Sequence, residues 1–235
     1  MTTMQIYQDP GDSLRRRPNL VDGLMSWPAT IAHHQVENQF TEALAWLIDR
    51  SDAFARRFVM LFAEDPESFR LYLDAAARIG ARTQVQIPSP KDGGSLFPDL
   101  SVDGSDRSFQ LLVEVKVGAE FGSHVIGGQA LLQPDAYAAA WALVEQSVQA
   151  EVRLVGTLSV AGPPESRPHP MRGRDVTWLE LRDALSEQLD DDALEEDVRL
   201  VAADLVEAIA ERILAEPPSG EALERFLSEA TPLVA

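Results

Sequence analysis

The segment Phe109–Val117 (FQLLVEVKV) limits the possible folds of this 235-residue chain more than any other segment. Its nearly continuous run of large apolar residues predicts a strand that is buried on both faces of a sheet. Glu114 and Lys116 interrupt that run, and side chains two residues apart on a strand point to the same face. Charges in a central strand are costly unless they are paired or bind a metal ion. The segment therefore predicts both an internal strand and a functional site on it.

The surrounding patterns predict an α/β fold. Alternating or clustered apolar residues between turn signals predict further strands over residues 82–88, 96–102 and 152–160. Apolar residues at helical spacing predict helices over 35–49, 52–63, 67–79, 129–147, 178–189, 194–214 and about 220–229. We expect Thr177 to cap the helix over 178–189, and we expect loops over 118–128 and 161–174. This order predicts a mixed central sheet of about four strands flanked by helices.

The length suits one domain that spans residues 1–235. We interpret residues 1–34 as an irregular N-terminal arm because prolines and glycines break any regular pattern there. Residues 35–160 hold the predicted core, and residues 161–235 hold a loop and C-terminal helices. The predicted domain is therefore a sheet core with N-terminal and C-terminal helical additions.

Composition excludes several kinds of site. The chain has no cysteine, so it has no disulfide or thiolate metal site, and any metal ion must be held by oxygen or nitrogen. No stretch has the length of a membrane span, and no apolar run follows the charges near the N-terminus. We therefore expect a cytoplasmic protein that makes no contact with a membrane.

Asp99 extends the charged pair of the central strand into a possible metal site. If the strands over 96–102 and 109–117 pair through the turn between them, Asp99 lies close to Glu114 and Lys116. Two carboxylates without a soft ligand suit Mg²⁺ or Mn²⁺, and the carbonyl oxygen of Val115 is a candidate further ligand. Lys116 would then steer a water molecule or neutralise charge on a phosphoryl group.

A plainer interpretation must be weighed against this site. A proline–aspartate pair such as Pro98–Asp99 is common at turns, and a Glu-x-Lys triplet occurs by chance. On an edge strand, Glu114 and Lys116 would form an ordinary solvated face. The apolar residues on both sides of them favour the functional interpretation.

Two further segments complete a pattern. Glu37 flanks the apolar stripe of the helix before the sheet, and Gln133 and Tyr137 lie four residues apart, on one face of a later helix. The ordered set of Glu37, Pro98–Asp99, Glu114–Val115–Lys116 and Gln133–Tyr137 resembles the PD-(D/E)XK nuclease superfamily over residues 35–160. That superfamily has the restriction-endonuclease-like fold.

The resemblance implies a role for each residue. Asp99 and Glu114 would bind Mg²⁺ (or Mn²⁺), Lys116 would position or activate the attacking water, and Glu37 would assist the metal site. Gln133 and Tyr137 would line the site and help to place the substrate. Pro134 follows Gln133 directly, where an apolar helix former is more usual, so Gln129 remains an alternative to Gln133.

The implied function is Mg²⁺-dependent hydrolysis of phosphodiester bonds in DNA, with RNA a less favoured substrate. Restriction or anti-phage defence is the role that the resemblance most readily implies. Phosphate contacts are predicted for arginines of the loop after the fourth strand, namely Arg167, Arg172 and Arg174. Simple solubility of that loop is an equal alternative.

The net charge of −18 opposes binding to a polyanion. Residues 180–235 hold 16 Asp and Glu against 4 Arg, a net of −12, so the acidity is concentrated in the C-terminal helices. We therefore expect DNA to be held through a homodimer or a larger complex assembled through these helices. The alternative is a catalytically silent or partner-activated scaffold of the same fold. A nucleotide substrate is a third option, which the lack of a glycine-rich phosphate loop disfavours.

Overall fold

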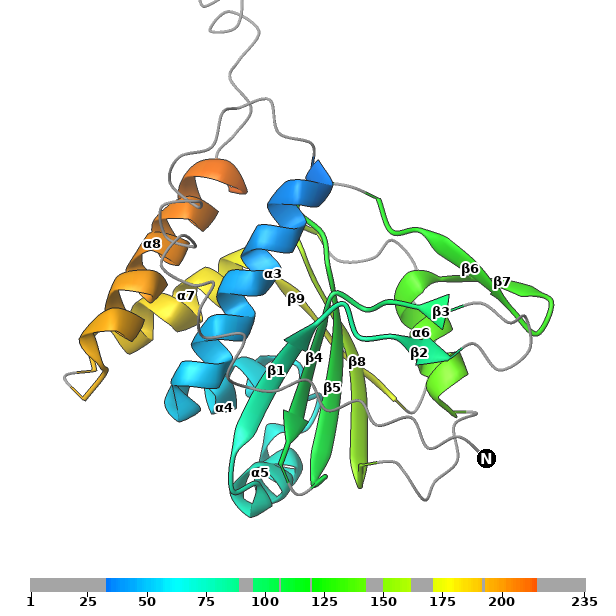
Figure 1. Ribbon diagram of the computed structural model, residues 1–235, viewed down its shortest axis with the longest axis horizontal. Coiled ribbons are helices and arrows are strands. Elements are labelled where there is room, and N and C mark those ends of the chain that lie inside the picture. Colours follow the sequence, from blue (N-terminus) through cyan, green and yellow to red (C-terminus); the bar gives the residue numbers. More distant parts are fainter. Residues whose placement is uncertain are drawn as a thin grey trace, which may run out of the picture.

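The computed structural model describes residues 33–88, 95–105, 107–118, 120–142, 150–161, 171–191 and 193–214 (Figure 1). The N-terminal arm predicted over residues 1–34 lies outside the described residues, except for residues 33 and 34, which begin a helix. The helix predicted over about 220–229 also lies outside them. The described chain is a mixed α/β fold, as the sequence predicts.

A five-stranded sheet forms the centre of the fold, in the order β1–β4–β5–β8–β9. Its strands are β1 (Ile79–Thr83), β4 (Leu100–Gly104), β5 (Phe109–Val115), β8 (Val152–Ser159) and β9 (Arg172–Thr177). The pairs β1–β4 and β4–β5 are antiparallel, whereas β5–β8 and β8–β9 are parallel. The strand predicted over Phe109–Val117 is therefore the middle strand, as its apolar run predicts, but it ends at Val115.

The fifth strand corrects the end of the loop predicted over residues 161–174, of which residues 162–170 lie outside the described residues. Strand β9 pairs in parallel with β8, and its first residue, Arg172, is 7% exposed. The arginines and glycine of this segment are typical of a surface loop. Burial of Arg172 beside carboxylates, which the local sequence does not reveal, makes a strand possible instead.

A hairpin corrects the loop predicted over residues 118–128. Strands β6 (Ser123–Ile126) and β7 (Gln129–Leu132) pair antiparallel through Gly127 and Gly128, whose φ angles are 61° and 82°. Two adjacent glycines suit such a two-residue turn because they adopt positive φ without a steric penalty. Helix α6 (Gln133–Ala142) therefore begins four residues later than the helix predicted over 129–147.

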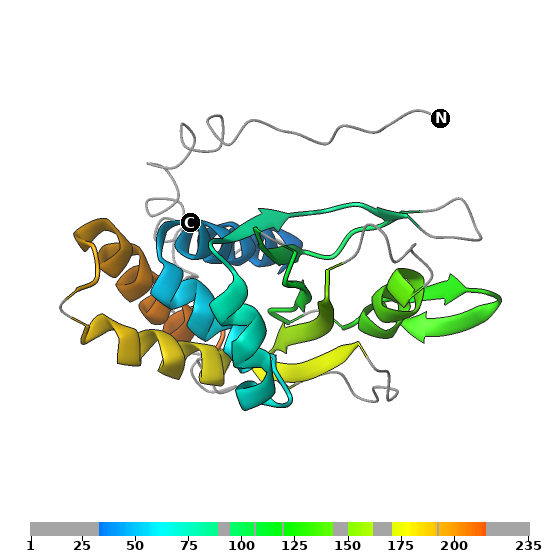
Figure 2. The ribbon, with the colours of Figure 1, turned by 90° about the horizontal axis from the view of Figure 1, so that it is seen from below.

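Helices lie on both faces of the sheet. Helices α3 (His33–Arg50), α4 (Asp52–Leu61) and α5 (Pro66–Ala75) precede the sheet in the chain and contribute to the core on one of its faces. Helix α6 covers the opposite face. Helices α7 (Trp178–Leu189) and α8 (Glu196–Arg212) follow the sheet and lie far from α6 and the β6–β7 hairpin (Figure 2). Helix α5 ends before the predicted residue 79, because the chain becomes extended at Ala76 and enters β1.

Thr177 caps α7, as the sequence predicts. Its hydroxyl accepts the N–H of Glu180, and the Glu180 carboxylate accepts the N–H of Thr177. This reciprocal capping box satisfies donors that the first helical turn would otherwise leave without partners. None of the described helices is both long enough and apolar enough to cross a membrane.

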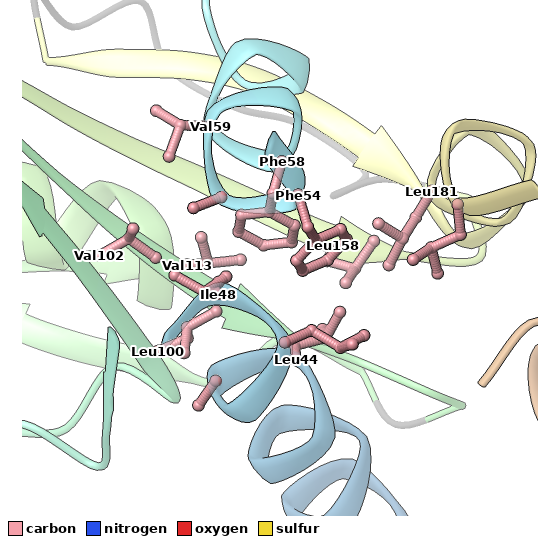
Figure 3. Close-up of a cluster of buried hydrophobic side chains, with 14 of the residues drawn as sticks. Leu44, Ile48, Phe54, Phe58, Val59, Leu100, Val102, Val113, Leu158 and Leu181 are labelled. Atoms are coloured by element: carbon pink, nitrogen blue, oxygen red, sulfur yellow. The ribbon is translucent and has the colours of Figure 1, made fainter. Parts of the chain in front are cut away.

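The main core fills the space between the sheet and α3, α4, α7 and α8 (Figure 3). Leu111, Val113 and Val115 of β5 belong to it, and the ring centroid of Phe40 lies 5.2 Å from that of Trp178. Leu112 belongs instead to a smaller cluster that includes Tyr137 of α6. Because side chains alternate along a strand, Glu114 lies on the α6 face.

The end of α4 packs closely against β9. The N–H of Arg174 donates to the carbonyl oxygen of Phe62 over 2.8 Å. A Cβ atom at Gly173 would lie 2.6 Å from that carbonyl oxygen, closer than such atoms approach in proteins. Glycine at this position therefore allows a helix end to cover part of the sheet.

We expect Gly173→Ala to lower the free energy of unfolding by about 1–3 kcal/mol, the usual cost of overpacking. The obstructing atom belongs to the backbone and cannot rotate away. Gly80→Ala is the matched control, because a Cβ atom there would lie 3.7 Å from its nearest neighbour, an ordinary contact. Urea unfolding of both variants checks the difference, and equal losses would contradict it.

Candidate functional site

Asp99 lies where a long antiparallel ladder is interrupted. Strand β2 (Ile87–Pro88) pairs with β3 (Ser95–Leu96) in the same register in which β1 pairs with β4. Thr83 pairs with Leu100 on one side of the interruption, and Ile87 pairs with Leu96 on the other. Asp99 thus directly precedes β4, beside the end of β5.

Both oxygens of the Asp99 carboxylate accept hydrogen bonds. Oδ2 accepts the backbone N–H of Val115 over 2.8 Å, and Oδ1 accepts Nε2 of Gln84 over 3.0 Å. The bond from Val115 links the Asp of the predicted motif to the residue between Glu114 and Lys116. The pairing of Leu100 with Val113 brings the two strands together at this level.

Lys116 lies between two buried carboxylates. Its Nζ is 2.7 Å from Oε1 of Glu114 and 3.8 Å from Oε2 of Glu37. The other oxygen of Glu37 accepts the backbone N–H of Val117 over 3.0 Å. The beginning of α3 therefore contributes a carboxylate to the carboxyl end of β5, although the rest of this helix packs on the opposite face from Glu114.

Helix α6 contributes a hydroxyl and an amide. The Tyr137 hydroxyl donates to Oε2 of Glu114 over 2.8 Å, with the carbonyl oxygen of Phe97 at 3.3 Å as a second acceptor. Nε2 of Gln133 donates to the Tyr137 hydroxyl over 3.5 Å, and Oε1 of Gln133 accepts the N–H of Gly122 over 2.7 Å. Both oxygens of Glu114 are thus bound, one by an ammonium and one by a phenol.

The backbone of Lys116 is fixed from two further directions. Its N–H donates to the carbonyl oxygen of Leu158 over 2.8 Å, which continues the ladder to β8. Its carbonyl oxygen accepts Nε1 of Trp178, also over 2.8 Å. Trp178 is fully buried, so the first residue of α7 secures the end of the strand that carries the site.

Burial dominates the electrostatics of the site. It raises the pKa of Glu114 to about 7, and the negative charge of Asp99 adds to that effect. Burial also raises the pKa of Asp99, although the N–H of Val115 opposes this. In Lys116, burial acts to lower the pKa, but the charge of Glu114, its hydrogen bond and the charges of Glu37 and Asp99 together outweigh burial, so the pKa is raised and the side chain stays an ammonium. Burial raises the pKa of Tyr137 as well, so its hydroxyl stays protonated and acts as a donor.

The structure brings together six of the predicted site residues: Glu37, Asp99, Glu114, Lys116, Gln133 and Tyr137. Gln133, rather than Gln129, contacts Tyr137, and Gln129 is exposed in β7. Gln133 is the first residue of α6, so Pro134 falls in the first turn, where proline is tolerated. The backbone N–H of Val115 binds Asp99, and a ligand role for its carbonyl oxygen stays a prediction.

The predicted phosphate-binding arginines do not form one loop cluster. Arg172 is buried in β9, where its guanidinium donates to Asp175 over 2.6 Å and lies 3.7 Å from Asp135 of α6. Arg174 is exposed but donates to Glu180 over 2.8 Å. Arg167 lies outside the described residues. Their assignment to phosphate therefore stays a prediction, which the ion pairs of Arg172 disfavour.

The sequence did not predict a role in the site for two residues. Gln84 contacts Asp99 across the interrupted ladder, and only the register of the strands places it there. Trp178 follows the predicted cap Thr177, and its apolar ring indicates core packing but not a bond to Lys116. For Trp178, the sequence indicated only that it stands at the start of a helix, directly after the cap Thr177.

The described residues contain no group of three or more His, Asp or Glu side chains arranged to hold a metal ion. The chemistry of the donors nevertheless fits a hard divalent cation. The partly buried carboxylate of Asp99 and the buried carboxylate of Glu114 repel each other, and Lys116 is the ammonium that Glu114 and Glu37 share. A cation bound by oxygen would offset that excess of negative charge.

Comparisons with models of known protein families, with curated proteins and with solved structures found no match. The residues of the site and their contacts therefore carry the functional argument.

The raised pKa of Glu114 predicts how Glu114→Gln changes stability with pH. The folded form holds its proton up to about pH 7, whereas the unfolded chain releases it near 4.5. The contribution of this group to the free energy of unfolding is therefore fully present below pH 4.5 and is lost as pH rises to about 7. Relative to wild type, Glu114→Gln should gain stability over this window, on the order of a few kcal/mol.

Glu180→Gln is the control with the opposite sign. The pKa of Glu180 is lowered because hydrogen bonds from Thr177 and the charge of Arg174 outweigh burial, so its contribution is lost as pH falls. Denaturant unfolding between about pH 3 and 8, with a chelator present, measures both variants, because the loss at Glu180 occurs below its unfolded pKa of 4.5. Parallel pH dependences in the two would show that burial does not disfavour the charged form of Glu114.

Proposed function

We propose that this protein is a Mg²⁺-dependent (or Mn²⁺-dependent) nuclease that hydrolyses phosphodiester bonds of DNA. The observation that carries the proposal is the joining of Asp99 to the Glu114–Lys116 strand through the N–H of Val115. The topology is compatible with a restriction-endonuclease-like fold of the PD-(D/E)XK superfamily. The antiparallel strands β4 and β5 carry the motif, and a helix then leads to a parallel strand.

Asp99 and Glu114 would hold the cation, with the carbonyl oxygen of Val115 as a further ligand. A bound Mg²⁺ would supply Lewis-acid polarisation of the phosphoryl oxygens and acidify a water molecule. A carboxylate offers about four lone-pair positions, and the protein's own hydrogen bonds occupy only part of them on each side chain. Ligation is therefore compatible with the contacts of both residues.

Lys116 would position the attacking water or neutralise the negative charge that develops on the phosphoryl group. Its ammonium is held by Glu114 and Glu37, which fix its direction at the edge of the site. Preorganised charge of this kind stabilises a transition state without reorganisation. Tyr137 would hold Glu114 in place through its protonated hydroxyl, and Gln133 would line the entrance beside the β6–β7 hairpin.

The charge distribution bears on how DNA would be held. No Lys or Arg occurs between Lys116 and Arg153, a stretch that includes the β6–β7 hairpin and α6. Residues 117–152 therefore supply no Lys or Arg for ion pairs with a phosphate backbone, and such pairs usually supply much of the affinity for DNA. A second copy of the chain or another subunit would then supply cationic contacts, in line with the acidic C-terminal helices.

Metal binding is testable without a substrate. We expect Mg²⁺ or Mn²⁺ at 100 times its Kd to stabilise the wild-type fold by about 2.7 kcal/mol, because only the folded state has the site. Asp99→Asn should lose this stabilisation. Asp103→Asn should keep it, because this substitution changes a carboxylate of the adjoining strand β4 that forms an ion pair with Arg82. Thermal unfolding with and without the cation measures the difference, and equal stabilisation of both variants would place the metal elsewhere.

Cleavage of plasmid and linear DNA tests the activity itself. We expect metal-dependent cleavage by wild type and a loss of about 100-fold or more in both Asp99→Ala and Lys116→Ala. Asp103→Ala is the matched control and should cleave normally. Cleavage that survives in both site variants would mean a contaminant or another site.

A different outcome would favour the alternative function, a catalytically silent or partner-activated scaffold. Metal binding without cleavage of any DNA or RNA, together with a stable partner, would indicate a partner-activated nuclease or a scaffold. A lack of both metal binding and cleavage would favour the scaffold alone.

A further inference from the structure

Gln84 has a backbone conformation that its residue type rarely adopts. Its φ angle is +51°, in the left-handed region, where the Cβ atom crowds the following carbonyl oxygen. Among the described residues other than glycine, Arg107 also has a positive φ, of 65°. Strain of this kind persists only where the surroundings enforce it, and it is often found at functional sites.

The strained residue lies directly opposite Asp99. The ladders on the two sides of the interruption share one register, so Gln84 and Asp99 face each other between them. The backbone N–H of Gln84 donates to the carbonyl oxygen of Asp99 over 3.1 Å. Its side-chain Nε2 donates to Oδ1 of the same residue over 3.0 Å. Gln84 therefore holds Asp99 by both its backbone and its carboxylate.

Neighbouring contacts keep Gln84 in this conformation. The Thr83 hydroxyl donates to Oε1 of Glu42 in α3 over 2.6 Å. Beyond Gln84, Nε2 of Gln86 donates to the Ser95 hydroxyl, and Ile87 resumes the ladder. The chain is thus fixed on both sides of one strained residue.

We propose that Gln84 is a positioning residue that orients the Asp99 carboxylate for the metal ion. This inference rests on the proposed function. Together with Val115, Gln84 holds one lone pair on each carboxylate oxygen and leaves the remaining lone pairs for the cation. Hydrogen bonds to a ligating carboxylate fix its direction, and removal of such a partner typically lowers metal affinity about 10- to 100-fold.

Two substitutions separate the amide from the strained backbone. Gln84→Met keeps the length and the strain but removes the donor, whereas Gln84→Gly removes both. We expect Mn²⁺ affinity, measured by isothermal titration calorimetry, to fall about 10- to 100-fold in both variants. Arg107→Gly is the matched control, because it relieves a similar φ in the turn after β4 and should bind Mn²⁺ as wild type does. Wild-type affinity in Gln84→Met would overturn the proposal.

A second readout needs no metal. The N–H of Val115 donates to Asp99, so its hydrogen exchange in a chelator reports how firmly the carboxylate is held. We expect exchange at Val115, measured by NMR, to accelerate several-fold in Gln84→Met and to stay unchanged in Arg107→Gly. If wild type binds no Mn²⁺, the proposed metal site fails. Unchanged exchange at Val115 would then show separately that Gln84 does not hold Asp99.

Discussion

The ammonium of Lys116, enclosed between the carboxylates of Glu114 and Glu37, is the interaction on which the site depends. An ion pair inside a sheet loses its hydration, and Coulomb attraction offsets that cost only if the geometry is fixed. The surrounding protein provides that geometry through the backbone. Hydrogen bonds from its N–H to the carbonyl oxygen of Leu158 and from Trp178 to its carbonyl oxygen fix the main chain of Lys116, so its side chain enters the site from an anchored point.

The carboxylates come from three different parts of the fold, and each is tied to β5. Glu37 reaches it from α3 through the N–H of Val117, and Asp99 reaches it from β4 through the N–H of Val115. Glu114 belongs to the strand itself. A backbone donor, unlike a side-chain donor, moves only when the strand moves. The sheet therefore sets the positions of the three carboxylates relative to one another. The large core beneath β5 keeps that sheet rigid.

Several of these features were predictable because their signals are local. The periodicity of residues 109–117 predicts the strand and the shared face of Glu114 and Lys116. Thr177 predicts the start of α7. Other features depend on contacts that are distant in sequence. From the sequence alone, Arg172 is typical of a surface loop, and only the folded structure brings it into ion pairs with Asp135 and Asp175. The strain at Gln84 arises from strand register and has no compositional signal. The hairpin at Gly127 and Gly128 had a local turn signal, which the apolar, charge-free residues after it obscured.

The bond between Trp178 and the carbonyl oxygen of Lys116 joins residues that are 62 positions apart. Synthesis proceeds from the N-terminus, so a ribosome completes β5 well before it adds the residue that secures its end. Until α7 emerges, the charged strand lacks one of its anchors and its core lacks the buried indole. The nascent chain therefore carries the charged side chains of the candidate site without the framework that aligns them, and the complete arrangement of the site is a late product of translation.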